Sequence, residues 1–231
     1  EIIANTTDDD STKVVQITRN TVKLEEQAAQ KQVLELTHNG QSKRIGIVTV
    51  PTFYVDFKAV QQGDPNYKST TRDVRRLIEE LQSEGDGIDG LVIDLRNNGG
   101  GSLQEADSLT GLFIRSGPTV QVKAASRRAN VYADTDDSTA WDGPMAVLVD
   151  RLSASASEIF AGAIQDYGRG IIIGNQTFGK GTVQTLVPLN RGQLKITAAK
   201  FYRISGQSTQ HQGVLPDIEF PESFDADRIG E

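Results

Sequence analysis

The alternation of hydrophobic and polar residues changes its period along the chain, and these changes predict the order of the elements. The segment 13–19 (KVVQITR) alternates polar and apolar residues, as a half-buried strand does, and 44–51 (RIGIVTVP) is a second, more apolar strand. In 69–85 apolar side chains recur at helical spacing, with Thr70 and Asp73 as a capping pair at the start. The first part of the chain is therefore expected to contain short strands followed by a helix.

Two strand–turn–helix units come next. In the first, the buried strand 90–95 (GLVIDL) leads into a glycine turn at 97–101 (NNGGG), after which Ser102 opens a helix. In the second, the strand 144–149 (PMAVLV) is followed by a short connection and a helix over 155–167. This arrangement places two turns at the ends of buried strands.

The last third of the chain is rich in strands. A buried strand at 170–174 (GIIIG) precedes a glycine-rich loop around Lys180, and two further strands are predicted at 182–187 and 193–203. Alternating strands and helices indicate an α/β layer structure, but the late run of strands departs from regular winding. The expected fold is a mixed sheet flanked by helices, of the α/β (α+β) class.

Composition excludes several classes of protein. The chain has 231 residues, a net charge of −7 and no cysteine, so thiol nucleophiles, iron–sulfur clusters and cysteine zinc sites are excluded. Basic residues form no cluster larger than a pair, such as 43–44, and nucleic-acid binding is not expected. The acidic run 8–10 is interpreted as a solvated turn instead of a metal site.

Targeting signals are not visible in the chain either. No apolar stretch approaches the ~20 residues of a membrane span, so membrane association is not indicated. The opening residues, EIIANTTDDD, do not resemble a signal peptide, and any export signal is expected upstream of this segment.

Ser155 lies in a serine-rich run, 153–158 (SASASE), where a strand ends and a helix begins. One interpretation is structural, because Ser155 and Glu158 match the S-x-x-E capping box. The other is catalytic, because backbone N–H groups at a helix start can stabilise an oxyanion, and removing one such donor typically costs ~3 kcal/mol. The local pattern alone leaves both interpretations open.

A catalytic serine needs a base, and Lys180 is the better candidate. The two histidines, His38 in a turn and His211 in a polar stretch, have the surroundings of surface residues. Lys180 is flanked by glycines and apolar residues in 178–183 (FGKGTV), and burial there would lower its pKa from ~10.4 towards the 7–8 that a base requires. The alternative interpretation is a lysine on a flexible glycine loop.

Two glycine-rich segments need separate interpretations. The segment 174–180 (GNQTFGK) nearly matches a phosphate-binding loop, but Gly181 stands where a magnesium-binding hydroxyl is required and a strand, not a helix, is predicted to follow. Nucleotide hydrolysis is therefore disfavoured. The glycine turn at 97–101 is either a simple turn or a ligand-facing loop that supplies a second oxyanion donor.

Three motifs together resemble those of the C-terminal processing peptidases, with the nearest similarity to the tail-specific proteases of the bacterial periplasm. They are 94–101 (DLRNNGGG), 153–158 (SASASE) and 178–184 (FGKGTVQ), in this order. The resemblance implies a nucleophile, a general base, a residue that orients the base, a further position important for activity, and an oxyanion hole. The corresponding residues are, in turn, Ser155, Lys180, Gln184, Asp166, and the amide of Ala156 with that of Gly99 or Gly100.

The resemblance also implies a fold like that of crotonase and Clp-type peptidases. It divides the chain into 1–19, the remnant of a PDZ-like domain or a linker, a serine peptidase core at 20–221, and a polar tail at 222–231. The implied function is a serine endopeptidase that cleaves proteins and peptides with non-polar C-terminal tails through an acyl-enzyme, without metal or cofactor.

The expected partners are protein or peptide substrates, bound through their C-termini, with an adaptor protein as a further candidate, and the expected location is the periplasm. Two alternatives belong to other classes of protein. One is a catalytically silent peptide-binding or scaffold relative of the same fold, which the intact serine and lysine disfavour. The other is a crotonase-type acyl-CoA enzyme, which would not need the combination of Ser155 and Lys180.

Overall fold

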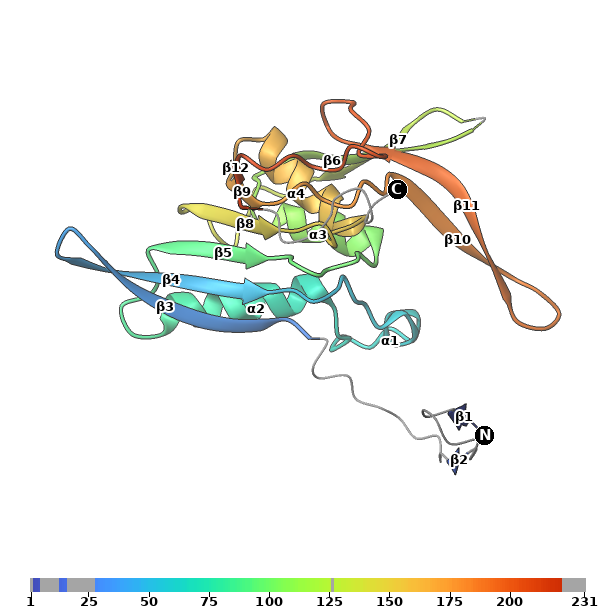
Figure 1. The fold of residues 1–231 in the computed structure, drawn as a ribbon, viewed down its shortest axis with the longest axis horizontal. Coiled ribbons are helices and arrows are strands. Elements are labelled where there is room, and N and C mark those ends of the chain that lie inside the picture. The colour runs from blue at the N-terminus through green and yellow to red at the C-terminus, as the bar shows by residue number, and fades with distance from the viewer. Residues whose placement is uncertain (1, 5–12, 16–27, 126, 222–231) are drawn as a thin grey trace.

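The computed structural model describes residues 2–4, 13–15, 28–125 and 127–221 (Figure 1). The acidic run 8–10 and the predicted polar tail 222–231 lie outside these ranges. None of the helices that the structure describes has the length and the apolar character to cross a membrane.

The largest sheet has six strands in the order β12-β9-β8-β5-β4-β3. Neighbouring strands from β12 to β4 run parallel, and β3 pairs antiparallel with β4 at the edge, so the sheet is mixed as predicted. The strands are β3 (Gln30–His38), β4 (Gln41–Thr49), β5 (Gly90–Asp94), β8 (Met145–Val149), β9 (Ile171–Gly174) and β12 (Ile218–Glu219).

A second sheet is antiparallel throughout, in the order β10-β11-β6-β7. Its strands are β6 (Gly117–Ala124), β7 (Asn130–Asp134), β10 (Thr182–Pro188) and β11 (Gln193–Tyr202). Two short strands near the N-terminus, β1 (Ile2–Ala4) and β2 (Lys13–Val15), form a separate antiparallel pair. The second strand of this pair begins the segment 13–19 that was expected to be a strand, and the assignment of 1–19 to a PDZ-like remnant stays a prediction.

Helix α2 packs against β3 and β4 of the six-stranded sheet and α4 packs against β9, while α3 packs against both helices; α3 and α4 also contact the second sheet. The helices are α1 (Phe57–Gln61), α2 (Thr70–Ser83), α3 (Leu103–Gly111) and α4 (Ala156–Asp166). The predicted capping pair of α2 is displaced by one residue, because Ser69 is the N-cap and its Oγ accepts from the amide of Arg72 at 3.4 Å.

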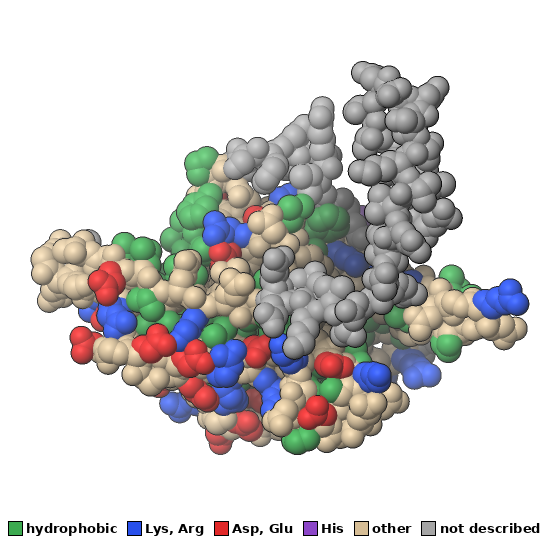
Figure 2. Space-filling model, turned by 90° about the horizontal axis from the view of Figure 1, so that it is seen from below, with side chains coloured by type: hydrophobic (Ala, Val, Ile, Leu, Met, Phe, Trp, Pro, Cys, Tyr) green, Lys and Arg blue, Asp and Glu red, His purple; other side chains and the backbone are tan. Residues whose placement is uncertain are grey.

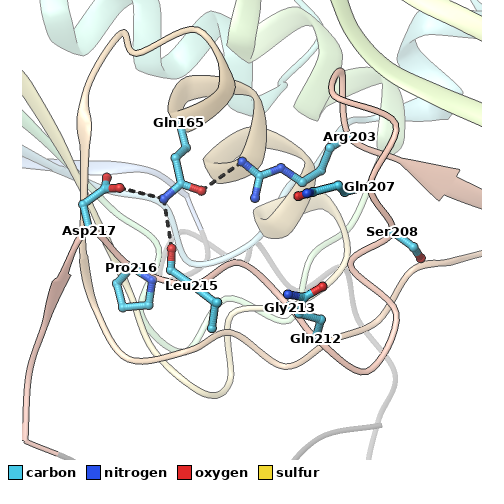
Figure 3. Close-up of a pocket in the computed structure, with 9 residues that line it drawn as sticks. All are labelled: Gln165, Arg203, Gln207, Ser208, Gln212, Gly213, Leu215, Pro216 and Asp217. Carbon is cyan, nitrogen blue, oxygen red and sulfur yellow. Dashed lines mark hydrogen bonds between the residues drawn. The ribbon is translucent and has the colours of Figure 1, made fainter.

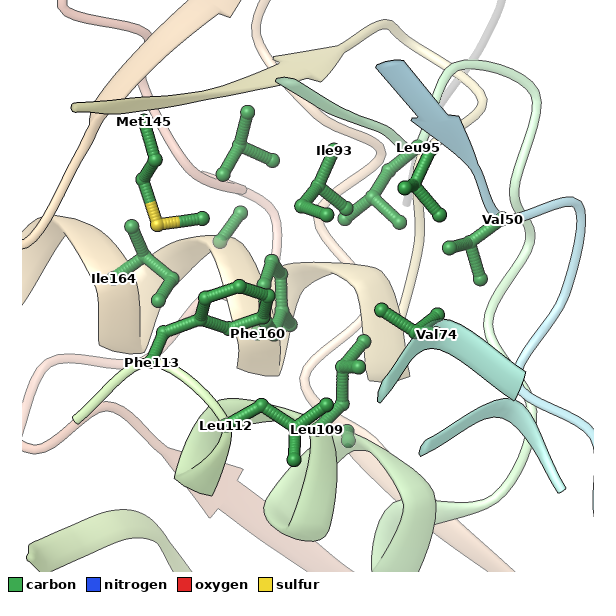
Figure 4. Close-up of a cluster of buried hydrophobic side chains, with 14 of the residues drawn as sticks. Val50, Val74, Ile93, Leu95, Leu109, Leu112, Phe113, Met145, Phe160 and Ile164 are labelled. Carbon is green, nitrogen blue, oxygen red and sulfur yellow. The ribbon is translucent and has the colours of Figure 1, made fainter. Parts of the chain in front are cut away.

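The main core lies between the six-stranded sheet and the helices α3 and α4 (Figure 4). Phe113 and Phe160 meet edge to face with their ring centroids 5.7 Å apart, and Ile93 and Ile164 are fully buried beside them. Because α4 is fixed along its whole apolar face, the N-terminus of this helix is held at the carboxyl end of β8. That position determines where Ser155 lies.

Charged side chains of both signs lie on the surface of the described residues (Figure 2). On the face shown in Figure 2, acidic and basic side chains of the described residues are intermingled, and no basic surface forms there. Ion pairs such as Lys31 to Glu80, at 2.9 Å, join β3 to α2 on the exterior. Pairs of this exposed kind contribute little to stability.

Sequence patterns missed the longer strands β3, β6 and β7 as well as the short strands β1 and β12. β3 has Val33, Leu34 and Leu36 on its surface with more than a third of each side chain exposed, so its apolar residues do not mark a buried face. The strand forms by hydrogen bonding along the whole length of β4. Pairing between strands, which the local pattern does not show, decides this element.

Candidate active site

The nucleophile turn, residues 150–155, connects β8 to α4. Ser155 is the N-cap of α4 and has φ 57° and ψ −108°, a left-handed conformation that costs a non-glycine residue about 1–2 kcal/mol. The turn is held in place by Asp150, whose Oδ1 accepts from the amide of Ser153 at 3.0 Å, and by the Ser153 hydroxyl, which donates to the carbonyl of Leu95 at 2.8 Å. The surrounding hydrogen bonds thus maintain the strained backbone that presents Ser155.

The glycine turn, residues 97–101, follows β5 and lies against the nucleophile turn. Asn98 is fully buried, and its side chain donates to the carbonyl of Val50 at 2.7 Å and accepts from the amide of Gly100 at 2.9 Å. The backbone carbonyl of Asn98 accepts from the amide of Ala154 at 3.0 Å and from the hydroxyl of Ser157 at 2.8 Å. Asn98 therefore joins the two turns on both sides of the predicted nucleophile.

Gly100 makes this approach possible because it has no side chain. Its φ is 101°, and a Cβ placed on it would lie 2.7 Å from the carbonyl oxygen of Ala154 and 2.9 Å from Cβ of Ser155. Both distances are shorter than a van der Waals contact between such atoms. Only glycine fits at this position without moving the nucleophile turn.

The lysine loop, residues 175–181, follows β9 and reaches the same region from the other side. Glu158, which is fully buried on the first turn of α4, accepts hydrogen bonds from the hydroxyl of Thr177 and from the amides of Gly179 and Lys180, at 2.7, 2.8 and 3.0 Å. The same carboxylate accepts from the amide of Ser155 at 2.7 Å. Burial is the largest influence on this carboxyl group and raises its pKa to about 6, although the hydrogen bonds oppose the shift.

A cleft of about 750 Å³ opens above these three segments. Of the residues predicted for the site, five line the cleft: Ser155, Lys180, Gln184, Gly99 and Ala156. Gly100 lies buried beneath them, against the nucleophile turn. Lys180 is partly buried, and among the residues that the structure describes it takes part in no ion pair.

The remaining walls of the cleft are mainly apolar. They are provided by side chains that come from the loop after β4, from α3 and α4, and from the second sheet. These include Phe53, Val55, Leu103, Val122, Ile159, Val183, Leu186 and Phe201.

Asp166, the further position predicted for the site, does not line this cleft. It lies at the C-terminal end of α4, where its Oδ1 pairs with the guanidinium of Arg203 at 2.7 Å and both side chains are largely buried. The same guanidinium donates to Oε1 of Gln165 at 2.9 Å, beside a separate polar cavity of about 360 Å³ (Figure 3). The structure thus brings together the other predicted site residues but not Asp166.

The structure also shows where the two histidines and the loop that resembles a phosphate-binding loop lie. His211 is exposed and touches the lysine loop through its backbone amide, which donates to the carbonyl of Gly179 at 2.7 Å, but it does not line the cleft. His38 is the last residue of β3, directly before a turn. The segment after Lys180 is β10, so this loop does not lead into the helix that a phosphate-binding loop requires. Within the described ranges, no cluster of three or more histidine, aspartate or glutamate residues could hold a metal ion.

Sequence reasoning missed two functional features of the site, the role of Asn98 and most of the role of Glu158. The capping-box pattern correctly pointed to the bond between Glu158 and the amide of Ser155. Nothing in that pattern indicates the three bonds to the lysine loop, which is distant in sequence. Asn98 was visible only as a member of a glycine-rich turn.

Comparison with known proteins identifies the family. Residues 44–220 match peptidase family S41. The chain is 43% identical over 229 residues to the tail-specific protease of Haemophilus influenzae, covering 95% of this chain and 30% of that protein. It is 40% identical over 178 residues to the carboxy-terminal-processing protease of Bartonella bacilliformis, covering 71% of this chain and 41% of that protein.

Solved structures agree with the sequence relatives. The photosystem II D1 C-terminal processing protease superposes with a TM-score of 0.70 at 30% identity, covering 94% of this chain and 54% of that one. Mature CPAF bound to lactacystin has a TM-score of 0.66 at 16% identity, covering 87% of this chain and 51% of that one, and so shares the fold. The chain thus spans well under two thirds of the length of these proteins, and over the part that it spans it belongs to peptidase family S41.

Proposed function

We propose that the chain is the catalytic part of a serine endopeptidase in which Ser155 is the nucleophile and Lys180 is the general base. The observation that carries this proposal is the cleft itself, which is lined by the hydroxyl-bearing Ser155, by Lys180 and by the backbone of Gly99 and Ala156. A nucleophile, a base and amide donors at one cleft are the groups that acyl transfer requires. The relatives' names, tail-specific and carboxy-terminal-processing protease, support the same reaction.

The reaction would proceed in two acyl transfers. Neutral Lys180 takes the proton from Oγ of Ser155 as this oxygen attacks the peptide carbonyl, and the protonated amine then gives the proton to the departing nitrogen. A water molecule, deprotonated by the same amine, attacks the resulting ester, and the proton returns to Oγ when the acid product leaves. Each proton and the acyl group pass only between the substrate, water, Ser155 and Lys180, so the proposed reaction uses no metal ion or cofactor.

The hydrogen bonds favour Gly99 over Gly100 as the second oxyanion donor. The amide of Gly100 already donates to the side chain of Asn98 at 2.9 Å. Among the described residues, no acceptor bonds to the amide of Gly99, and Gly99 lines the cleft. The amide of Ala156 is on the first residue of α4, where it has no partner within the helix. We therefore assign the oxyanion hole to Gly99 and Ala156.

Gln184 would orient the amine of Lys180. It lies on β10 at a register shift between Val183 and Gln184, and both residues line the cleft. Irregularities of this kind redirect a side chain beside an active site. For Asp166 we propose a structural role, because its carboxylate pairs with Arg203 at the other end of α4.

The apolar walls of the cleft support a preference for substrates with non-polar C-terminal tails. Such tails, presented by unstructured proteins, would lie across the cleft in extended form. The periplasmic location and an adaptor protein stay predictions that follow from the resemblance to the bacterial tail-specific proteases.

The test is cleavage of an unstructured substrate that ends in a non-polar tail. Ser155→Ala and Lys180→Ala should each abolish cleavage and leave the urea unfolding midpoint nearly unchanged. Lys195→Ala is the matched control, since Lys195 lines the same cleft from β11 and has no assigned role in the reaction. Full activity of Lys180→Ala, or loss of activity in His211→Ala instead, would show that the proposed base is wrong.

The same assay separates the other function classes. If the chain is a silent peptide-binding relative, the wild type and Ser155→Ala should bind the substrate equally well, and neither should cleave it. A rise in kcat/KM of the wild-type chain with pH would support a reaction that needs a general base.

A further inference from the structure

One buried carboxylate connects the nucleophile turn to the lysine loop. Glu158 accepts from the amide of Ser155, from the hydroxyl of Thr177, and from the amides of Gly179 and Lys180. Capping of α4 explains only the first of these bonds. The other three join α4 to the lysine loop, which follows β9 in the chain, and two of the four bonded residues are the proposed nucleophile and the proposed base.

We propose that Glu158 is a positioning residue for the peptidase reaction. Its carboxylate holds the backbone of Ser155 and that of Lys180 at the same time, so the hydroxyl and the amine keep the separation that proton transfer requires. The inference rests on the proposed function, because it explains how that pair is held together. Catalysis depends steeply on such geometry, and a displacement of about 1 Å can reduce the rate about 100-fold.

The four bonds need the ionised form of the side chain. Every partner of Glu158 is an N–H or O–H donor, and an ionised carboxylate only accepts, so all four bonds can form together. A carboxamide of the same size places an NH₂ group opposite these donors and loses at least one bond. The chain keeps a fully buried carboxylate at a desolvation cost that a simple cap would not require.

Charged and titratable groups lie on each element around Glu158. Lys180 is on the lysine loop, Asp150 and Arg151 are on the nucleophile turn, and His211 is on the loop that donates its amide to Gly179. Arg151 donates to the carbonyl of Thr177 at 2.7 Å. Burial raises the pKa of Glu158, and the four hydrogen bonds to its carboxylate lower it and so oppose that rise.

The experiment compares Glu158→Gln with Glu105→Gln. Glu105 on α3 is also a buried carboxylate, and its Oε2 accepts from the amide and from the hydroxyl of Thr71, both at 2.8 Å, away from the cleft. We expect Glu158→Gln to lower kcat about 100-fold and to change KM less than about twofold. We expect Glu105→Gln to keep kcat within about twofold of wild type, even if its unfolding midpoint falls.

Amide hydrogen exchange provides a readout that does not depend on cleavage. The amides of Gly179 and Lys180 should exchange faster in folded Glu158→Gln than in wild type, whereas amides of β5 should not. If the wild-type chain cleaves nothing but these amides respond, the proposed function fails, while the structural premise that Glu158 holds the lysine loop is supported. Wild-type kcat in folded Glu158→Gln, or equal losses of kcat in both variants, would overturn the inference.

The wild-type chain supplies a second measurement in case Glu158→Gln does not fold. Lowering the pH through about 6 should protonate Glu158, remove an acceptor from the lysine loop and reduce the exchange protection of Gly179 and Lys180, after correction for intrinsic rates. Because its pKa is raised, this carboxyl group favours the folded state more in acid than at neutral pH, so its own protonation would not unfold the chain. Protection that stays constant from pH 5 to about 7.5 would contradict the proposal.

Discussion

A methyl group added at Gly100 would collide with the nucleophile turn. In Gly100→Ala the new Cβ would lie 2.9 Å from Cβ of Ser155, whereas carbon atoms in contact are about 3.5–4.0 Å apart, so one of the two must move by about 0.6–1 Å. The residue also has φ 101°, which costs alanine about 1–2 kcal/mol. Overpacking adds about 1–3 kcal/mol. The expected loss of unfolding free energy is therefore about 2–5 kcal/mol.

Gly192→Ala is the control that isolates the collision. Gly192, between β10 and β11, has φ 81° and nothing within 4 Å of a built Cβ, so alanine there has the backbone strain alone. Urea unfolding should show a loss of about 1–2 kcal/mol for this control and a larger loss for Gly100→Ala. In the cleavage assay, folded Gly100→Ala should lose at least about 100-fold in kcat, because Ser155 and its oxyanion donors move.

The reasoning would be refuted by a Gly100→Ala variant that matches Gly192→Ala in both unfolding free energy and kcat. Such a result would mean that the glycine turn can retreat without disturbing Ser155. A large loss of stability with unchanged kcat would equally contradict the coupling of the two turns, since the displaced atom is the Cβ of the nucleophile itself.

Three further predictions concern the same site. Ser155→Gly and Ser155→Ala should both be inactive, but the glycine variant should be more stable by about 1 kcal/mol, because φ is 57° at this position; equal urea midpoints would show that the turn is unstrained. Asp166→Asn should lose about 1–3 kcal/mol of stability through its pair with Arg203 and keep kcat within about twofold, whereas loss of kcat at unchanged stability would indicate a catalytic role. Because burial raises the pKa of Glu158 from 4.5 to about 6, its contribution to the unfolding free energy is greatest below pH 4.5 and falls by about 2 kcal/mol as the pH rises through 6. Urea unfolding of wild type and Glu158→Gln from pH 4.5 to 7 measures this difference, and parallel pH curves would contradict it.

Sequence patterns predicted most of the elements that build the site, and the structure confirms them. The strands β5 and β8 and the helices that follow them were all expected, because their residues carry strong apolar periodicity and capping signals. Strands of the second, antiparallel sheet were predicted less well. β6 and β7 belong to the antiparallel sheet, where pairing between distant segments and partial exposure weaken the local signal.

The site itself was predicted in part. Ser155, Lys180 and Gln184 were identified by resemblance, and the structure places them at one cleft. Asp166 was assigned by resemblance to a family position, but it lies at the other end of α4 from Ser155, where it pairs with Arg203. Spacing along a helix gives the direction of a side chain without giving the neighbours that it meets.

The sequence alone determined most of the strands and helices and pointed to a candidate nucleophile and a candidate base, since turns, caps and periodicity arise from residues a few positions apart. Only the tertiary structure decided which glycine amide is free to bind an oxyanion and what Glu158 holds. Both depend on hydrogen bonds between segments that are far apart in the chain and meet only when α4 packs against the sheet. A buried hydrogen-bond donor or acceptor needs a partner, but local sequence does not determine which group that partner is, because the two groups meet only when the core packs.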